Sequence, residues 1–350
     1  MEGTRRTFTW KRWVLLFIII VVLGRLELPY YYSQPGIAQT LEGMIEVEEG
    51  YKDDTGAFML TTIRSARATP LLAVWSLFSQ FRSLSPAPKN ISDEEYDERQ
   101  IMLMNNSQES AKIAAYRAAG KGEVEIDYSG VFVTGVVPGM SADGVLEAGD
   151  LITAVNGETI ETVEELFDHI SDYKEGETVE LTYERGTAIR TDTFTFSTFP
   201  VDQSVEDGQV GIGIVGPVTK RSARFDPAVE ISAGSIGGPS AGLMFALEIY
   251  SQLLEIDLTK GYQIAGTGTI DDDGNVGPIG GAKQKVVAAD REGADYFLAP
   301  NENGAHHSNY KEAKAAAEAI GSNMEIIPVD TLEEALSFLK GLPPKESAAS

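Results

Sequence analysis

One glycine-rich stretch constrains the fold more than any other part of the sequence. It runs from Ile236 to Met244 and reads I-G-G-P-S-A-G-L-M, so a tight turn leads directly into an apolar run. That run, from Leu243 to Leu254, carries its large apolar side chains at helical spacing. The pattern therefore predicts a buried helix that begins at or just after Ser240.

Ser240 is a candidate nucleophile because of this position. The free N–H groups and the positive dipole end of a helix N-terminus stabilise developing negative charge. A serine nucleophile also needs a base that takes its proton. Two interpretations stay open at this point: a Gly/Pro-rich turn whose serine caps a helix, and a nucleophile elbow of the G-x-S-x-G type found in α/β-hydrolases.

The three histidines, His169, His306 and His307, are poor candidates for that base. His169 lies in another predicted unit of the chain. His306 and His307 follow Ser240 in the order that an α/β-hydrolase requires. That fold also needs an apolar strand directly before the serine, and residues 232–235 read S-A-G-S. A Ser-His-Asp hydrolase is therefore kept only as an alternative.

Two lysines offer a second kind of base. The segment from Gly277 to Lys285 reads G-P-I-G-G-A-K-Q-K and places Lys283 and Lys285 at the start of another predicted helix. The helix dipole and apolar neighbours both lower a lysine pKa, as a general base requires. Lys285 has alanines on its helix face, whereas Lys283 shares its face with Asp290. The sequence thus favours Lys285, and a helix-surface position predicts that Lys285→Ala changes stability by under about 0.5 kcal/mol.

Together these motifs resemble the Lon-type Ser-Lys protease domain. G-P-S-A-G is followed 45 residues after its serine (285 − 240) by the lysine that ends P-I-G-G-x-x-x-K. The resemblance implies that Ser240 and Lys285 form the catalytic dyad and that Thr267 holds the lysine. It also implies an oxyanion hole of backbone N–H groups near the serine, at Gly238, Pro239 and Ala241.

The sequence departs from full Lon enzymes at two points. Gly237 stands where Lon enzymes commonly carry an acidic residue, two positions before the proline. No G-x-x-x-x-G-K-[ST] motif occurs, so the ATPase module is missing and no cofactor is expected. The acidic run from Asp271 to Asp273 lacks the spacing of an EF-hand, so it is interpreted as a turn and no metal site is predicted.

A second resemblance covers residues 121–200. The run A-G-D-L-I-T-A-V-N-G from Ala148 to Gly157, with a helix after it, resembles a PDZ domain. PDZ domains bind an extended peptide between a strand and that helix. The resemblance implies that the peptide contacts a carboxylate-binding loop and the helix, at Ser129, Gly130, Val131, Val163 and Phe167. The alternative is a PDZ-like spacer that binds nothing.

The N-terminus predicts a membrane anchor. Basic residues from Arg5 to Arg12 precede an apolar run from Trp13 to Gly24, and the stretch from Trp10 to Leu28 reaches the about 20 residues that a bilayer requires. No A-x-A cleavage site follows. The charge flank predicts a single pass with the basic end inside and the bulk of the chain extracytoplasmic.

Composition narrows the partners and the compartment. There are 53 acidic and 28 basic residues, for a net charge of −25, which argues against nucleic acid or an anionic membrane surface as partner. The chain has no cysteine, so a disulfide framework and zinc-thiolate sites are excluded.

The full chain resembles the membrane-anchored PDZ/Lon-like proteases of Gram-positive bacteria (SepM/YlbL type). The expected organisation is a cytoplasmic tail (1–12), an anchor (13–29), an N-terminal extracytoplasmic region (30–120), a PDZ domain (121–200) and an α/β (α+β) Lon-type proteolytic domain (205–342). The resemblance implies an ATP-independent serine endopeptidase of the cell membrane, acting on peptides or small membrane or secreted proteins such as signalling peptides or a cell-division inhibitor. A non-catalytic PDZ-based binding scaffold is the alternative.

Overall fold

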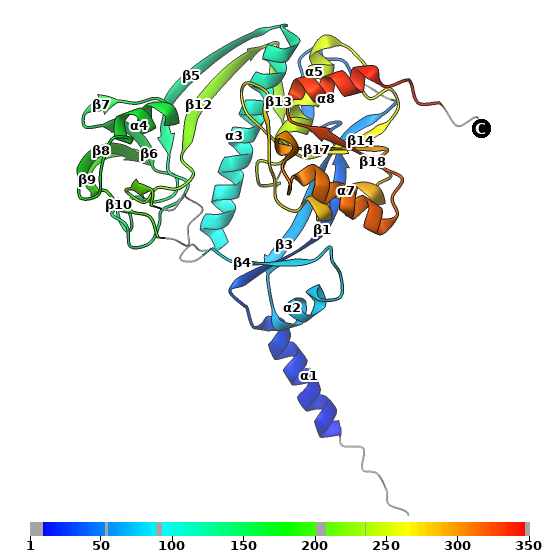
Figure 1. Ribbon diagram of the computed structural model, residues 1–350, viewed down its shortest axis with the longest axis horizontal. Helices are drawn as coiled ribbons and strands as arrows, with labels where there is room; N and C mark the ends of the chain where they lie inside the picture. Colours follow the sequence, from blue (N-terminus) through cyan, green and yellow to red (C-terminus); the bar gives the residue numbers. More distant parts are fainter. Residues whose placement is uncertain (1–9, 53–54, 89–92, 201–207, 235, 347–350) are drawn as a thin grey trace, which may run out of the picture.

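The structure is a computed structural model that describes residues 10–52, 55–88, 93–200, 208–234 and 236–346. Its strands form two six-stranded sheets, one in an α/β body and one in a smaller unit carried on a long two-stranded arm (Figure 1). Residues 1–9 of the predicted tail (1–12) and residues 205–207 of the predicted 205–342 unit lie outside the described residues.

The body sheet combines strands from both ends of the chain. Its order is β18-β17-β14-β3-β1-β4, with β14 parallel to β3 and β17, β17 parallel to β18, and β1 antiparallel to β3 and β4. The strands are β1 (Tyr30–Thr40), β3 (Ala57–Arg67), β4 (Ser83–Pro86), β14 (Gln263–Gly266), β17 (Tyr296–Pro300) and β18 (Glu325–Val329). Strands of the predicted N-terminal region (30–120) therefore belong to the body, because β3 hydrogen-bonds directly to β14.

Alternate residues of the central strands point to opposite faces of this sheet, as the pleat requires. Phe58 and Leu60 pack in one core with α5 and α8, whereas Met59 packs in another with α6 and α7. The helices are α3 (Asp93–Ala119), α5 (Gly242–Leu254), α6 (Ala282–Arg291), α7 (Asn309–Ile320) and α8 (Leu332–Gly341). The long helix α3 packs along α5 and stands between the body and the smaller unit (Figure 1).

The smaller unit is the predicted PDZ-like one, with an additional strand from beyond its predicted end. Its sheet has the order β12-β5-β6-β8-β9, with β7 paired to β6. The elements are β5 (Glu123–Phe132), β6 (Leu151–Val155), β7 (Glu158–Thr159), α4 (Val163–Ile170), β8 (Thr178–Arg185), β9 (Ala188–Thr195) and β12 (Val218–Asp226). The antiparallel strands β5 and β12 form the arm (Figure 1).

The remaining strands and one 3₁₀ turn are short. Two small strand pairs lie in the body, β2 (Ile45–Val47) with β13 (Val229–Ile231), and β15 (Thr269–Ile270) with β16 (Val276–Gly277). A third joins β10 (Ser197–Thr198) to β11 (Val210–Gly211) in the smaller unit, and η1 (Glu302–Gly304) is a single 3₁₀ turn.

The N-terminal helix α1 (Trp10–Arg25) projects away from the body, and α2 (Pro70–Ser76) lies near the C-terminal end of α1, where α1 meets the body (Figure 1). Within the described residues, no helix combines the length and the apolar character needed to cross a membrane.

Candidate active site

Ser240 lies in the turn that leads into α5. Gly242 is the first residue of that helix, and a Cβ atom there would lie 2.7 Å from Oγ of Ser107, so only glycine fits. The N–H of Gly268 donates to the carbonyl oxygen of Ser240 at 3.0 Å. The hydroxyl of Ser107 donates to the carbonyl oxygen of Pro239 at 2.8 Å. The turn formed by residues 237–241, here called the nucleophile loop, is therefore fixed on one side by the residues that follow β14 and on the other by α3.

Lys285 lies in the first turn of α6, and its side chain contacts this loop at Ser240. The helix starts after Gly281, which has φ of 76° and occupies the left-handed region that favours glycine. Lys285 is only 2% exposed, and burial lowers its pKa to about 7, because a desolvated ammonium is disfavoured. Among the described residues, no carboxylate forms an ion pair with it.

Ser240, Lys285 and Thr267, which the family resemblance predicts to lie together, are in contact in the structure. Nζ of Lys285 lies 2.6 Å from Oγ of Ser240 and 2.8 Å from Oγ1 of Thr267. Thr267, which is fully buried, donates its hydroxyl proton to the carbonyl oxygen of Ser240 at 3.0 Å. Since that single proton is used, Oγ1 of Thr267 accepts from the lysine. The lone pair of a neutral amine is then available to the hydroxyl proton of Ser240.

Of the expected oxyanion donors, only the N–H of Ala241 is available. The N–H of Gly238 donates to the carbonyl oxygen of Gln100 in α3 at 2.9 Å, and Pro239 has no N–H. In the described part of the chain, the N–H groups of Ser240 and Ala241 form no hydrogen bond. These two amides at the helix start are therefore the available donors. Nothing in the sequence marks Gln100 or Ser107 as neighbours of the nucleophile loop.

The remaining candidate bases lie elsewhere. His169 contacts the carbonyl oxygen of Glu165 and the carboxylate of Glu158 on the smaller unit. His306 and His307 are exposed and contact each other at 3.3 Å. Lys283 has a half-exposed side chain, 3.9 Å from a carboxylate oxygen of Glu312. None of these side chains reaches Ser240, so the Ser-His-Asp arrangement has no geometric support here.

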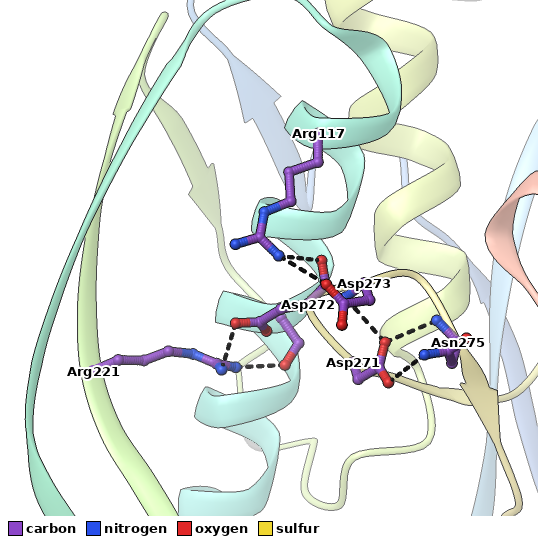
Figure 2. Close-up of polar contacts among 7 residues, drawn as sticks. Arg117, Arg221, Asp271, Asp272, Asp273 and Asn275 are labelled. Atoms are coloured by element: carbon purple, nitrogen blue, oxygen red, sulfur yellow. Dashed lines mark hydrogen bonds and ion pairs between the residues drawn. The ribbon is translucent and has the colours of Figure 1, made fainter. Parts of the chain in front are cut away.

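A second polar cluster lies in the turn between β15 and β16 (Figure 2). Arg221 of β12 donates to Oδ2 of Asp272 at 2.8 Å and also to Oγ of Ser110 in α3. Arg117 donates to the carbonyl oxygen of Asp272 at 3.0 Å, and Asp271 accepts from the N–H of Asn275 at 2.8 Å. The acidic run thus forms a turn, and Arg221 links it to the arm.

The smaller unit has a cavity of about 820 Å³ between α4 and residues 209–217. Phe167 lines it, together with Leu166 and Ile170 of the same helix, and Arg99 of α3 reaches it from outside the unit. A cavity bounded by a helix and an extended segment has the form of a peptide groove.

The predicted carboxylate-binding loop does not line this cavity. Ser129, Gly130 and Val131 lie inside β5, and Val131 is completely buried. Val131 is paired to β12 on one side and β6 on the other, so its backbone has no free edge for a peptide. Val163 donates its N–H to Oγ1 of Thr219 at 3.0 Å and is not a cavity residue either.

Two family models match parts of the chain. Residues 222–340 match the Lon protease (S16) C-terminal proteolytic domain, and residues 102–194 match the PDZ domain. The chain therefore contains a Lon protease C-terminal proteolytic domain and a PDZ domain.

Individual proteins are similar to parts of this chain. The chain is 38% identical over 114 residues to a Lon protease of Rickettsia bellii and 34% identical over 112 residues to one of Trichlorobacter lovleyi. These alignments cover 32% and 31% of this chain but only 14% and 13% of the relatives. A solved PDZ domain of an SdrC-like protein from Listeria monocytogenes is 32% identical and covers 26% of this chain and 90% of its own, with a TM-score of 0.23.

Proposed function

We propose that this chain is an ATP-independent serine endopeptidase in which Ser240 and Lys285 form the catalytic dyad. One observation carries the proposal: the amine of Lys285, buried and with a pKa lowered to about 7, lies 2.6 Å from the hydroxyl oxygen of Ser240. A neutral amine at that distance can accept the proton of the attacking hydroxyl. Both matched domains accord with a peptide or protein substrate.

The geometry supports the following sequence of steps. Oγ of Ser240 forms a bond to the peptide carbonyl carbon while its proton passes to Nζ of Lys285. The amides of Ser240 and Ala241 stabilise the oxyanion, aided by the N-terminal dipole of α5. The peptide C–N bond then breaks, and the proton moves from Lys285 to the leaving amine. Water hydrolyses the ester by the same route in reverse order, with Lys285 again as the base. Thr267 holds the amine in position throughout.

An electrophilic label tests the dyad without knowledge of the natural substrate. The intact chain is treated with a fluorophosphonate, and the modified residue is located by mass spectrometry. We expect labelling at Ser240, strong loss of labelling in Lys285→Met, and retention in Lys283→Ala. The His306→Ala/His307→Ala variant is expected to label normally. Labelling that survives Lys285→Met but is lost in the histidine variant would contradict the mechanism.

A comparison of membrane and medium proteomes tests whether the activity is proteolysis. Cells that carry the Ser240→Ala chain should accumulate uncut peptides or small proteins that cells with the unmodified chain process. Unchanged proteomes, together with unchanged recovery of bound partners, would favour the non-catalytic PDZ scaffold.

We propose further that the PDZ domain recruits the substrate through the cavity beside α4. Phe167→Asp places a charge in this apolar cavity, while Ile189→Asp changes an exposed side chain of the same unit. The first change should slow cleavage of a native protein substrate more than cleavage of a short unstructured peptide. The second change should affect neither. An equal loss on both substrates in Phe167→Asp would mean that the domain serves folding and not recruitment.

The proposed location is the outer face of the cell membrane, with α1 as the anchor. Every residue from Trp13 to Val22 is at least 41% exposed, so apolar side chains surround the helix on all sides. Such a surface is stable in lipid and costly in water. Protease added to intact protoplasts should degrade the catalytic domain. A domain that resists until the membrane is broken, or that accumulates in the medium, would contradict this location.

A further inference from the structure

The helix α2 is apolar, yet the body of the protein does not bury it. None of its seven residues is buried, and the chain continues past its end into Leu77 and Phe78, which are 81% and 73% exposed. The exposed apolar side chains of this segment are Leu71, Val74, Trp75, Leu77 and Phe78, here called the α2 surface. Since the sheet and the helices around it have their own cores, this surface is available to something outside the body.

The position of α2 is tied to the end of α1. The N–H of Leu28 donates to the carbonyl oxygen of Ala68 at 2.8 Å, which joins the residues after α1 to those before α2. Leu71 lies against Gly24, where its Cδ1 would be 3.3 Å from an added Cβ atom. The α2 surface therefore continues the apolar surface of α1 at the point where α1 meets the body (Figure 1).

Tryptophan occurs only in these two helices. The chain has three tryptophans: Trp10 and Trp13 at the start of α1, and Trp75 in α2. Tryptophan gathers at both water interfaces of a bilayer. The 16 residues of α1 span about 24 Å, which is shorter than the about 30 Å of a hydrocarbon core. Apolar side chains on α2 would extend the lipid-compatible surface past the end of α1.

The stretch that contains α2, residues 55–88, is positively charged, whereas the whole chain is negatively charged. The net charge of the whole chain is −25, whereas residues 55–88 contain Arg64, Arg67 and Arg82 and no acidic residue. The guanidinium of Arg82 lies over the ring of Trp75 at 4.5 Å. An arginine beside an exposed tryptophan can extend towards lipid headgroups while the ring enters the interface. No carboxylate within residues 55–88 repels an anionic membrane surface, and Asp93, which is paired with Arg67 at 2.7 Å, offsets one of the three positive charges.

We propose that the α2 surface inserts into the outer leaflet of the bilayer beside α1, so that the body contacts the membrane at a second place. This inference rests on the proposed membrane attachment through α1. With two contacts, the body is held at a fixed height and orientation and cannot swing on a single helix. The substrates that the site can reach are then those at the membrane surface.

Fluorescence of the full chain in vesicles tests this contact. The Trp10→Phe/Trp13→Phe variant keeps Trp75 as its tryptophan and is reconstituted in phosphatidylcholine and phosphatidylglycerol vesicles with brominated acyl chains, which quench a nearby indole. As a control, Trp10→Phe/Trp13→Phe/Trp75→Phe/Ile189→Trp carries its tryptophan at an exposed site of the PDZ domain. We expect most of the Trp75 emission to be lost in brominated vesicles and the control emission to be unchanged.

The other outcomes separate the two proposals. If the chain sediments with the vesicles but Trp75 is not quenched, the α2 contact is wrong and the attachment through α1 stands. If Trp75 instead becomes shielded only as protein concentration rises, and Leu77→Ser/Phe78→Ser abolishes that change, a second copy covers the surface and the lipid contact is wrong. If the chain does not sediment with vesicles at all, the membrane attachment fails, and the α2 contact fails with it.

Discussion

Two buried cations, Lys285 in α6 of the body and Arg221 in β12 of the arm, have opposite environments. Lys285 is 2% exposed and contacts two hydroxyl groups, whereas the side chain of Arg221 is 11% exposed and faces the carboxylate of Asp272. Without a counter-charge, burial lowers the lysine pKa to about 7. The guanidinium keeps its charge under all ordinary conditions. Burial among hydroxyls thus produces a base, and burial beside a carboxylate produces a fixed link between segments.

The link made by Arg221 lies close to the nucleophile. Asp272 lies two residues after Ile270. The Cγ2 atom of Ile270 would be 2.8 Å from a Cβ atom added to Gly242, the first residue of α5. Burial raises the pKa of Asp272 even though Arg221 is beside it, so desolvation outweighs the attraction. Nε of Arg221 and Oδ1 of Asp272 have no hydrogen-bond partner within the described structure. The pair therefore contributes position more than stability.

The largest expected effect comes from removing the base. Lys285→Met keeps the length of the side chain but not the amine, and activity should fall by about 10² to 10⁴-fold. Lys285→Arg should be equally inactive, because a guanidinium does not release its proton near neutral pH. The measurement is kcat/KM on a peptide substrate, and a Lys285→Met chain with normal activity would remove Lys285 from the mechanism.

The effect on stability differs from the one expected of a surface helix position. Lys285 is buried, so Lys285→Ala leaves a cavity and should cost about 2 to 5 kcal/mol, as other large buried truncations do. Lys285→Met fills most of that space and should unfold at the same denaturant concentration as the unmodified chain or higher. This variant therefore separates loss of chemistry from loss of fold.

The next effect is expected from breaking the link. Arg221→Met leaves the carboxylate of Asp272 buried and uncompensated, and should lower the free energy of unfolding by about 3 kcal/mol. Arg221→Met/Asp272→Leu removes both charges and should recover most of that loss. Arg224→Met, on the same strand but with a 75% exposed side chain, is the matched control and should cost under about 1 kcal/mol. Equal losses in the two arginine variants would mean that the buried link has no special role.

A change of pH should affect the protein through Lys285 but not through Arg221. The expected change in activity is smaller than the loss caused by removing the Lys285 amine. Activity requires neutral Lys285, so the rate should rise through pH 7 and fall about tenfold for each pH unit below it. Between pH 7 and about 10.4, the unfolded lysine binds a proton that the folded one does not, so stability should rise with pH. Lys285→Met should abolish that slope in a denaturant titration and Arg221→Met should keep it. A rate that is flat across pH 6 to 8 would contradict a lysine base.

The sequence predicted the parts of the site that lie within short motifs. Ser240 and Lys285 each sit at a glycine-marked helix start, and Thr267 was placed by the same family resemblance. The chain segments that support them were missed, because α3 brings Gln100 and Ser107 to the loop from more than 130 residues away. Contacts of that kind depend on helix packing, which leaves no local pattern in the sequence.

Strand pairing explains the other differences. The residues of β1 were assigned to an N-terminal region (30–120), but β1 pairs with β3 in the body sheet, and a bulge between Pro35 and Ala38 accommodates Pro35 and Gly36. The carboxylate-binding loop of the PDZ domain was expected at residues 129–131, yet this stretch lies in β5, where Val131 pairs with β12 and β6, and the cavity lies beside residues 209–217. The order of strands in a sheet is set by tertiary contacts and not by the periodicity of each strand.

The smallest effect is expected at Lys283, which lies two residues before Lys285. Its side chain is 48% exposed and its nearest carboxylate oxygen, on Glu312, is 3.9 Å away. An exposed pair at that distance contributes under about 1 kcal/mol, and the amine has no path to Ser240. Lys283→Ala should therefore keep kcat/KM within about twofold and leave the pH profile in place. If Lys283→Ala shifted the midpoint of the profile while Lys285→Met did not, the assignment of the base to Lys285 would have to be reversed.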